Sequence, residues 1–187
     1  MDAENLKLRR RVLLIYFATA AGTALWLAAI VGAPYLRSRG FGGASFLYAC
    51  FAPICHQIPS RSFFLRGFPL AVCARCLGIY SGFAAGILFY PFGRGFSAPR
   101  LPRLKIFVLV SLPIILDTAG NFFRLWNTGN ALRFLTGFLW GTILPFFWFA
   151  GLADLFSRQG GGRRPTENGT RSDSRQAEPG AAETPQK

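Results

Sequence analysis

The chain has 187 residues, of which 51% are hydrophobic, 20 are phenylalanine and only 16% carry a charge. This composition excludes an ordinary water-soluble domain, because so large an apolar fraction has to face something other than water. The net charge of +13 would suggest nucleic acid as the partner of a soluble protein, but here the basic residues stand mainly at the ends of apolar runs. We therefore expect no nucleic acid, and a lipid bilayer with anionic headgroups as the partner of these charges.

The apolar residues come in runs of about 20, the length of helix that crosses the hydrocarbon core of a bilayer. The first run covers about 12–33 and follows Lys7 and three arginines, like the start of a secretory signal. It is too long for a signal that is cleaved, so we expect a retained membrane anchor. The next run, 41–54, is shorter and contains Pro53, which favours a half-helix or an interfacial helix.

Three further runs are long enough to span, at about 72–92, 104–123 and 134–156. The sequence thus predicts an all-α membrane protein with four transmembrane helices and one short half-helix or interfacial helix. Glycines at four-residue spacing share one helical face in the second and fourth spans, where another helix can approach closely. These glycines are Gly78, Gly82, Gly86, Gly137 and Gly141.

The end of the chain has a different composition from the spans. From Ser157 onward there is no aromatic residue, and Gly, Pro, Ser, Arg and Glu dominate. We therefore expect residues 158–187 to form a disordered tail. Asp154, at the end of the last span, is expected to pair with Arg158 at the membrane interface.

The distribution of basic residues predicts the orientation in the membrane. Fourteen of the 21 lysines and arginines lie before the first span, between the second and third spans, or in the tail. Because basic residues beside short loops are retained in the cytoplasm, both termini are predicted to be cytoplasmic. The loop before the second span then lies on the non-cytoplasmic side, together with the polar residues between the third and fourth spans.

Cysteine and histidine mark a candidate metal site in that outer loop. Cys73 and Cys76 stand one helical turn apart, and Cys55 with His56, the single histidine, lies upstream of them. Two pairs of ligands separated by a loop predict a tetrahedral site of Cys55, His56, Cys73 and Cys76, with Zn(II) as the metal. Cys55 and His56 can share one ion only if the chain turns there, which the neighbouring prolines favour.

Thiol redox chemistry is an alternative use of the same cysteines. Cys73 and Cys76 would form the active pair, Cys50 and Cys55 a relaying pair, and a membrane quinone would accept the electrons. This arrangement resembles, in architecture only, the disulfide-bond-forming membrane proteins and the vitamin K epoxide reductases. In a further alternative the cysteines are structural, and the protein is a non-enzymatic membrane scaffold or a transporter component.

Charged and amide side chains near the same end form a second candidate site. Asp117 lies inside a span, where an ionisable residue indicates function because an unpaired charge costs several kcal/mol. We expect a pocket for a polar or anionic group, such as a lipid headgroup, because arginine matches phosphate bidentately. Its candidate catalytic residues are Asp117, Asn121, Arg61, Arg75 and Arg133. The structural alternative is a pair between Asp117 and Arg124 or Arg133, with the arginines as interfacial anchors.

Several of these segments occur together in one known family. They are Cys55-His56-Gln57, the stretch 71–82 with its Cys-x-Arg-Cys, the pair Leu116-Asp117, and 132–137. With them the chain resembles, over most of residues 45–145, the membrane proteins grouped as domain of unknown function 2085. The resemblance implies one site built from Cys55, His56, Cys73 and Cys76, with Cys50 outside it. Thr118 and Asn121 depart from the family pattern, which usually has Gly and often Gln there.

Overall fold

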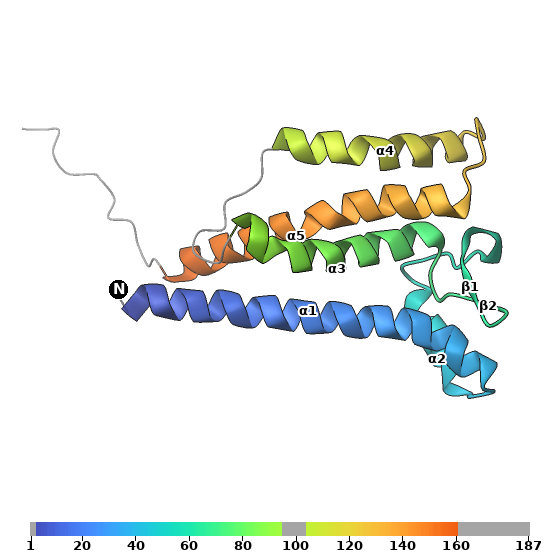
Figure 1. Cartoon of the computed structure of the whole chain (residues 1–187), viewed down its shortest axis with the longest axis horizontal. Helices are drawn as coiled ribbons and strands as arrows, with labels where there is room; N and C mark the ends of the chain where they lie inside the picture. The colour runs from blue at the N-terminus through green and yellow to red at the C-terminus, as the bar shows by residue number, and fades with distance from the viewer. Residues whose placement is uncertain (1–2, 95–103, 161–187) are drawn as a thin grey trace, which may run out of the picture.

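The computed structural model describes residues 3–94 and 104–160. Four long helices make up most of this part (Figure 1). In chain order the elements are α1 (Ala3–Ser38), α2 (Gly43–Phe51), the 3-10 turn η1 (Pro59–Arg61), β1 (Phe64–Leu65), β2 (Phe68–Pro69), α3 (Ala74–Arg94), α4 (Leu104–Phe122) and α5 (Asn130–Gly160). The class is therefore helical, as the sequence predicts.

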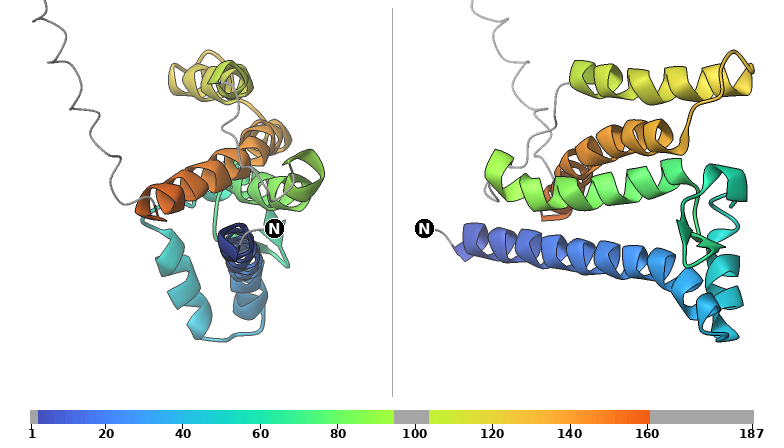
Figure 2. Two further views of the ribbon diagram at one scale, coloured as in Figure 1. Left: turned by 90° about the vertical axis from the view of Figure 1, so that its left-hand side faces the viewer. Right: turned by 45° about the vertical axis from the view of Figure 1, so that its right-hand side comes forward.

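The four long helices lie side by side, and their axes are roughly parallel lines (Figures 1 and 2). α3 packs against both α1 and α5. Among the long helices, α4 makes extensive contact with α5 only. Successive long helices run in opposite directions, so the start of α3, the end of α4 and the start of α5 lie at one end (Figure 1). The candidate site residues predicted from the sequence lie at this end, together with α2, β1 and β2.

The α3–α5 pair is the most closely packed contact, and glycine is the reason. A Cβ added to Gly78 or Gly82 would overlap the backbone carbonyl oxygens of Phe134 and Phe138 on α5. A Cβ added to Gly141 would likewise overlap the carbonyl of Ile79 on α3. Only glycine permits this distance between two backbones. The close helix approach predicted from the glycine spacing thus occurs between the second and fourth predicted spans.

Three of the described helices are long and apolar enough to cross a membrane: Arg9–Ser38, Leu104–Phe122 and Asn130–Leu152. The four predicted transmembrane helices are therefore not all confirmed, because α3 is not among these three. Its sequence carries Arg75, four glycines and two tyrosines in 21 residues, which lowers its mean hydropathy. α3 packs between α1 and α5, so much of its surface faces protein, and fewer strongly apolar side chains are needed there.

The predicted half-helix region forms the nine-residue helix α2. The segment that follows it, residues 52–73, covers the ends of α1 and α3 and is called the cap here. The cap also contains a two-stranded hairpin, in which Leu65 pairs with Phe68, and this hairpin was not predicted. Its two-residue turn has positive φ at both Arg66 (52°) and Gly67 (83°). Such a turn matches the twist of two antiparallel strands. Four strand residues are too few for an alternating pattern to be recognised in an apolar sequence.

The cap is held by a small hydrophobic core. Ile30 and Ala33 of α1, Phe51 of α2, and the stretch Leu70–Val72 before α3 are all buried in it. Cys55 is part of the same core and is only 4% exposed. This core fixes the loop after α2 against the start of α3, and so positions the cysteines.

The predicted tail lies almost wholly outside the described residues. α5 continues to Gly160, and residues 161–187 are not described. The expected pair between Asp154 and Arg158 also concerns side chains outside the described part of the chain.

Candidate functional site

Three cysteines meet where the cap joins α3. Cys55 follows α2, and its backbone N–H donates a hydrogen bond of 3.0 Å to the carbonyl of Phe51, which continues the helical turn. Cys73 directly precedes α3, and Cys76 lies in its first turn. The sulfur atoms of Cys55, Cys73 and Cys76 all lie within 4.8 Å of one another. The sequence thus predicted a real cluster, contributed by two segments that are 18 residues apart in the chain.

Hydrogen bonds converge on the sulfur of Cys55. The thiols of Cys73 and Cys76 both interact with it, and these bonds, Cys73 first, hold the pKa of Cys55 below its usual range. The backbone N–H of Cys73 also donates to this sulfur, at 3.2 Å. Burial acts in the opposite direction and is outweighed. Cys55 is therefore the thiol that the surroundings favour as a thiolate, the form in which cysteine binds metals.

The cluster has the dimensions of a metal site. Zinc–sulfur bonds of about 2.3 Å in tetrahedral geometry place the sulfurs about 3.8 Å apart. The observed upper limit of 4.8 Å is close to this value, so small side-chain rotations are enough to bring three sulfurs onto one ion. Three protein ligands leave a fourth position for water, a substrate or a further side chain.

His56 is not part of this cluster. Its side chain is exposed, and its ring nitrogens do not belong to the group of ligand atoms within 4.8 Å. The next residue, Gln57, has φ 49° and thus reverses the chain here. The structure therefore brings together three of the four predicted ligands, and His56 lies on the solvent side of the turn.

Gln57 supports the cluster, and this role was not predicted from the sequence. Its amide nitrogen donates hydrogen bonds to the carbonyls of Tyr48 (2.7 Å) and Ala71 (2.9 Å). These bonds tie the end of α2 to the segment that leads into Cys73. The Cys-His-Gln segment of the family resemblance was the available signal for this residue.

Cys50 is separate from the other three cysteines. It is exposed on α2, whereas Cys55 is buried. All four cysteines are free thiols in this structure. The relaying pair of Cys50 and Cys55 considered in the redox alternative is therefore not formed here.

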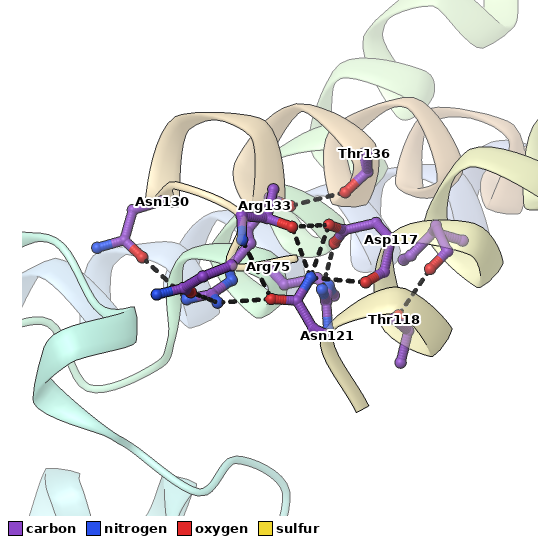
Figure 3. Close-up of polar contacts among 10 residues, drawn as sticks. Arg75, Asp117, Thr118, Asn121, Asn130, Arg133 and Thr136 are labelled. Carbon is purple, nitrogen blue, oxygen red and sulfur yellow. Dashed lines mark hydrogen bonds and ion pairs between the residues drawn. The ribbon is translucent and has the colours of Figure 1, made fainter. Parts of the chain in front are cut away.

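A second polar cluster surrounds Asp117 near the end of α4 (Figure 3). The Asp117 carboxylate forms an ion pair with Arg75 of α3. It also accepts hydrogen bonds from the hydroxyl of Thr128 (2.6 Å) and the amide of Asn121 (3.0 Å). Asp117 is only 6% exposed, so these partners replace the water that its charge has lost.

The ion pair differs from the expected structural pair of Asp117 with Arg124 or Arg133. Arg124 is exposed, and its positive φ of 56° belongs to the turn after α4. Arg133 is buried but is bonded to neutral groups, the side-chain oxygens of Asn121 (2.9 Å) and Asn127 (3.2 Å). The expectation failed because the partner comes from α3, and the sequence does not show which side of α3 faces α4.

The connection between α4 and α5 supplies more of this cluster than its sequence suggested. Residues 127–130 have the composition of an ordinary turn, but Thr128 is buried against Asp117 and Asn127 binds Arg133. Asn130 donates to the carbonyls of Ser62 (3.3 Å) and Ser60 (3.4 Å), which attaches the η1 segment. Polar turn residues are too common for this role to have been distinguished.

Positive charge exceeds negative charge in this cluster. The positive charges of Arg61 and Arg75 both act on Arg133, and the negative charge of Asp117 acts in the opposite direction. Arg61 is exposed at the end of η1. The buried Nε of Arg75 has no hydrogen-bond partner among the described residues. Asp117 forms an ion pair with Arg75 alone, so positive charge is in excess among the described side chains of this cluster.

The two clusters lie on opposite sides of the first turn of α3. Cys73 and Cys76 face the core made by α1, α2 and the cap. Arg75, between them in the chain, turns instead toward α4. The candidate metal site and the candidate arginine site are therefore neighbours, separated by one turn of α3.

Comparison with known proteins places the chain in a family. The family model described as predicted membrane protein (DUF2085) matches residues 55–147. An uncharacterised protein of Methanocaldococcus jannaschii is 40% identical over 101 residues, which cover 54% of this chain and 65% of that protein. An uncharacterised protein of Methanothermobacter thermautotrophicus is 32% identical over 90 residues, covering 46% of this chain and 77% of that protein.

The matched region begins at Cys55 and ends within α5, so it contains both clusters and leaves out Cys50. The match spans less than two thirds of the length of the Methanocaldococcus protein. No solved structure matches the chain significantly. The chain belongs to the DUF2085 family of predicted membrane proteins.

Proposed function

We propose that this protein is a four-span membrane protein that binds one Zn(II) ion through Cys55, Cys73 and Cys76, next to an arginine site for an anionic lipid headgroup. The observation that carries the proposal is the meeting of three sulfurs within 4.8 Å. Among the metals available to proteins, zinc combines affinity for thiolate with a preference for four ligands in a tetrahedron. Water or the lipid itself takes the fourth position.

The arginine site is proposed from its charge balance. Asp117 neutralises one of the three guanidinium groups of Arg61, Arg75 and Arg133, so the cluster attracts an anion. Arg61 is exposed and can reach a group that arrives from the headgroup layer. Asp117 and Asn121 hold Arg75 and Arg133 in position rather than contact the lipid.

In the proposed topology α3 also crosses the membrane, which brings the number of spans to four, and both termini are cytoplasmic. The support is the alternating direction of α1, α3, α4 and α5 (Figure 1), together with the excess of basic residues in the sequence before the first span, between the second and third spans, and after the fourth. Both clusters then lie at the non-cytoplasmic headgroup level.

Cys50 offers a direct test of this orientation, because it is exposed and outside the cluster. Intact cells are treated with a membrane-impermeant maleimide, and labelling of the purified protein is measured. We expect labelling that Cys50→Ser removes. Labelling that requires permeabilised cells would reverse the proposed orientation.

Metal analysis tests the zinc site. Protein purified in mild detergent is expected to contain about one zinc per chain, from the ligand count of a single tetrahedral site. Cys55→Ser and Cys76→Ser should lose the zinc, and Cys50→Ser is the matched control that should keep it. Zinc-free wild-type protein that fails to take up added zinc, or equal zinc in all variants, contradicts the proposal.

A thiol oxidoreductase is the second candidate, favoured by the short distance between the free thiols of Cys73 and Cys76. In its reaction the two thiols form a disulfide, and a quinone takes up the two electrons and two protons to become a quinol. A thiol count before and after treatment with a short-chain benzoquinone separates the two candidates. Loss of two reactive thiols with one equivalent of quinol formed, in zinc-free protein, supports the oxidoreductase.

A further inference from the structure

An apolar cleft lies between α1 and the α3–α5 pair, at the depth of the spans. Its volume is about 370 Å³, and its walls include Gly22 and Trp26 of α1, Ile79, Tyr80 and Phe83 of α3, and Leu144 of α5. This volume is in the range of sites that hold small organic ligands. Thr23 also lines the cleft, but its hydroxyl donates to the carbonyl of Thr19 of its own helix at 2.8 Å. The cleft is thus suited to hydrocarbon.

One end of the cleft lies near the cysteine cluster. Tyr80 is one helical turn from Cys76 and packs against the core that contains Cys55. The Tyr80 ring also packs edge-on against the ring of Trp26 across the cleft, with 5.9 Å between the ring centroids. Phe83 lies almost one turn further from the cysteines, toward the middle of α3. Tyr80 therefore connects one end of the apolar cleft to the core that contains Cys55, while the rest of the cleft extends away from the cysteines.

We infer that this cleft binds one hydrocarbon chain of a membrane lipid, whose polar head lies at the cysteine cluster. This inference rests on the proposed zinc site for the role of the head, because the open fourth position of the metal accepts an oxygen of the lipid. The chain itself is held by the apolar walls, at the same level as the acyl chains of the surrounding bilayer. The ligand class is then a membrane lipid whose acyl chain is bound by the cleft and whose head group is bound at the metal.

Gly22 keeps the cleft open. A Cβ at this position meets no atom within 4 Å, so a larger side chain can be accommodated, and it would occupy the space of the ligand. Gly32, on the same helix, also has no atom within 4 Å of an added Cβ, and it does not line the cleft. Gly22→Leu and Gly32→Leu are therefore a matched pair, in which one substitution fills the cleft and the other does not.

Photolabelling tests the inference in full-length protein in detergent. The probe is a phosphatidylglycerol that carries a diazirine within one acyl chain, and labelled peptides are identified by mass spectrometry. We expect labelling concentrated on the peptides of Ile79–Phe83 and Gly22–Trp26, a several-fold decrease in Gly22→Leu, and no change in Gly32→Leu. If Gly22→Leu does not fold, Leu144→Trp fills the same cleft from α5 and replaces it.

The zinc content of the same samples separates this inference from the proposed function. Labelling of the cleft in protein that binds no zinc supports the site for the lipid's acyl chain but contradicts the proposed role of the metal. Labelling that is spread over the outer surface of α4 and is unaffected by Gly22→Leu and Leu144→Trp overturns the chain site, whatever the zinc content.

Discussion

The cysteine cluster and the arginine cluster lie on the two sides of one helical turn, and they satisfy their polar atoms differently. The carboxylate of Asp117 is matched by Arg75, Thr128 and Asn121, so its bonds are complete within the protein. The three sulfurs have mainly one another and backbone N–H groups as partners. The comparison teaches that burial of a polar residue does not by itself mark a binding site. The cysteine cluster is therefore the stronger candidate for a binding site, because its sulfur atoms remain available to a ligand.

Removing the central acid should produce the largest effect. In Asp117→Ala the charges of Arg75 and Arg133 remain near one another without a carboxylate, and breaking a buried pair in this way costs about 3–5 kcal/mol. We expect a large decrease in the melting temperature of the detergent-solubilised protein, followed by fluorescence-detected size-exclusion chromatography. Asp117→Asn, which keeps the shape, is the comparison variant. Unchanged stability in both variants would show that the arginine cluster does not hold α3, α4 and α5 together.

Loosening the cysteine loop should have an intermediate effect that leaves the arginine cluster intact. Gln57→Leu removes the hydrogen bonds to Tyr48 and Ala71, and loss of an outer partner of a metal site typically lowers affinity by about 10-fold to 100-fold. Zinc competition with a colorimetric chelator measures this change. His56→Ala is the matched control and should differ little from wild type. A larger loss in His56→Ala would mean that the histidine rotates in as the fourth ligand.

Neutralising the exposed arginine should have the smallest effect on stability. Arg61→Gln removes a charge that acts on Arg133 without breaking a bond of the buried network, and exposed charges contribute about 0–1 kcal/mol. Binding to vesicles that contain phosphatidylglycerol should weaken, while zinc content and melting temperature stay unchanged. The exposed Arg39 provides the control, as Arg39→Gln. Equal weakening in both variants would reduce the arginine cluster to general interfacial attraction.

The sequence predicted those features that depend on composition and short spacing. Apolar runs located the long helices, and the glycine spacing predicted the close approach now seen between Gly82 and Phe138. The meeting of Cys55 with Cys73 and Cys76 followed from their positions on either side of one loop. The predicted span at about 72–92 forms the helix α3 but is not confirmed as a membrane span, because its glycines and Arg75 lower its hydropathy.

Features that depend on the direction of a side chain in three dimensions could not be read from the sequence. Asp117 binds Arg75 because of the rotation of α3 about its axis, which no spacing within α4 reveals. The exposure of His56 likewise depends on the chain reversal at Gln57. The hairpin around Arg66-Gly67 could not be recognised either, because each of its strands has only two residues.

Arg75 lies in the chain between Cys73 and Cys76, two of the candidate metal ligands, and this position has a thermodynamic consequence. Its backbone carbonyl is packed so closely against α5 that a Cβ on Gly137 would overlap it, so the turn that carries Cys73 and Cys76 cannot shift independently of Arg75. An ion bound on one side and an anion bound on the other therefore act on the same few backbone torsions. Binding linkage is reciprocal, so whatever factor zinc exerts on lipid affinity, the lipid must exert on zinc affinity.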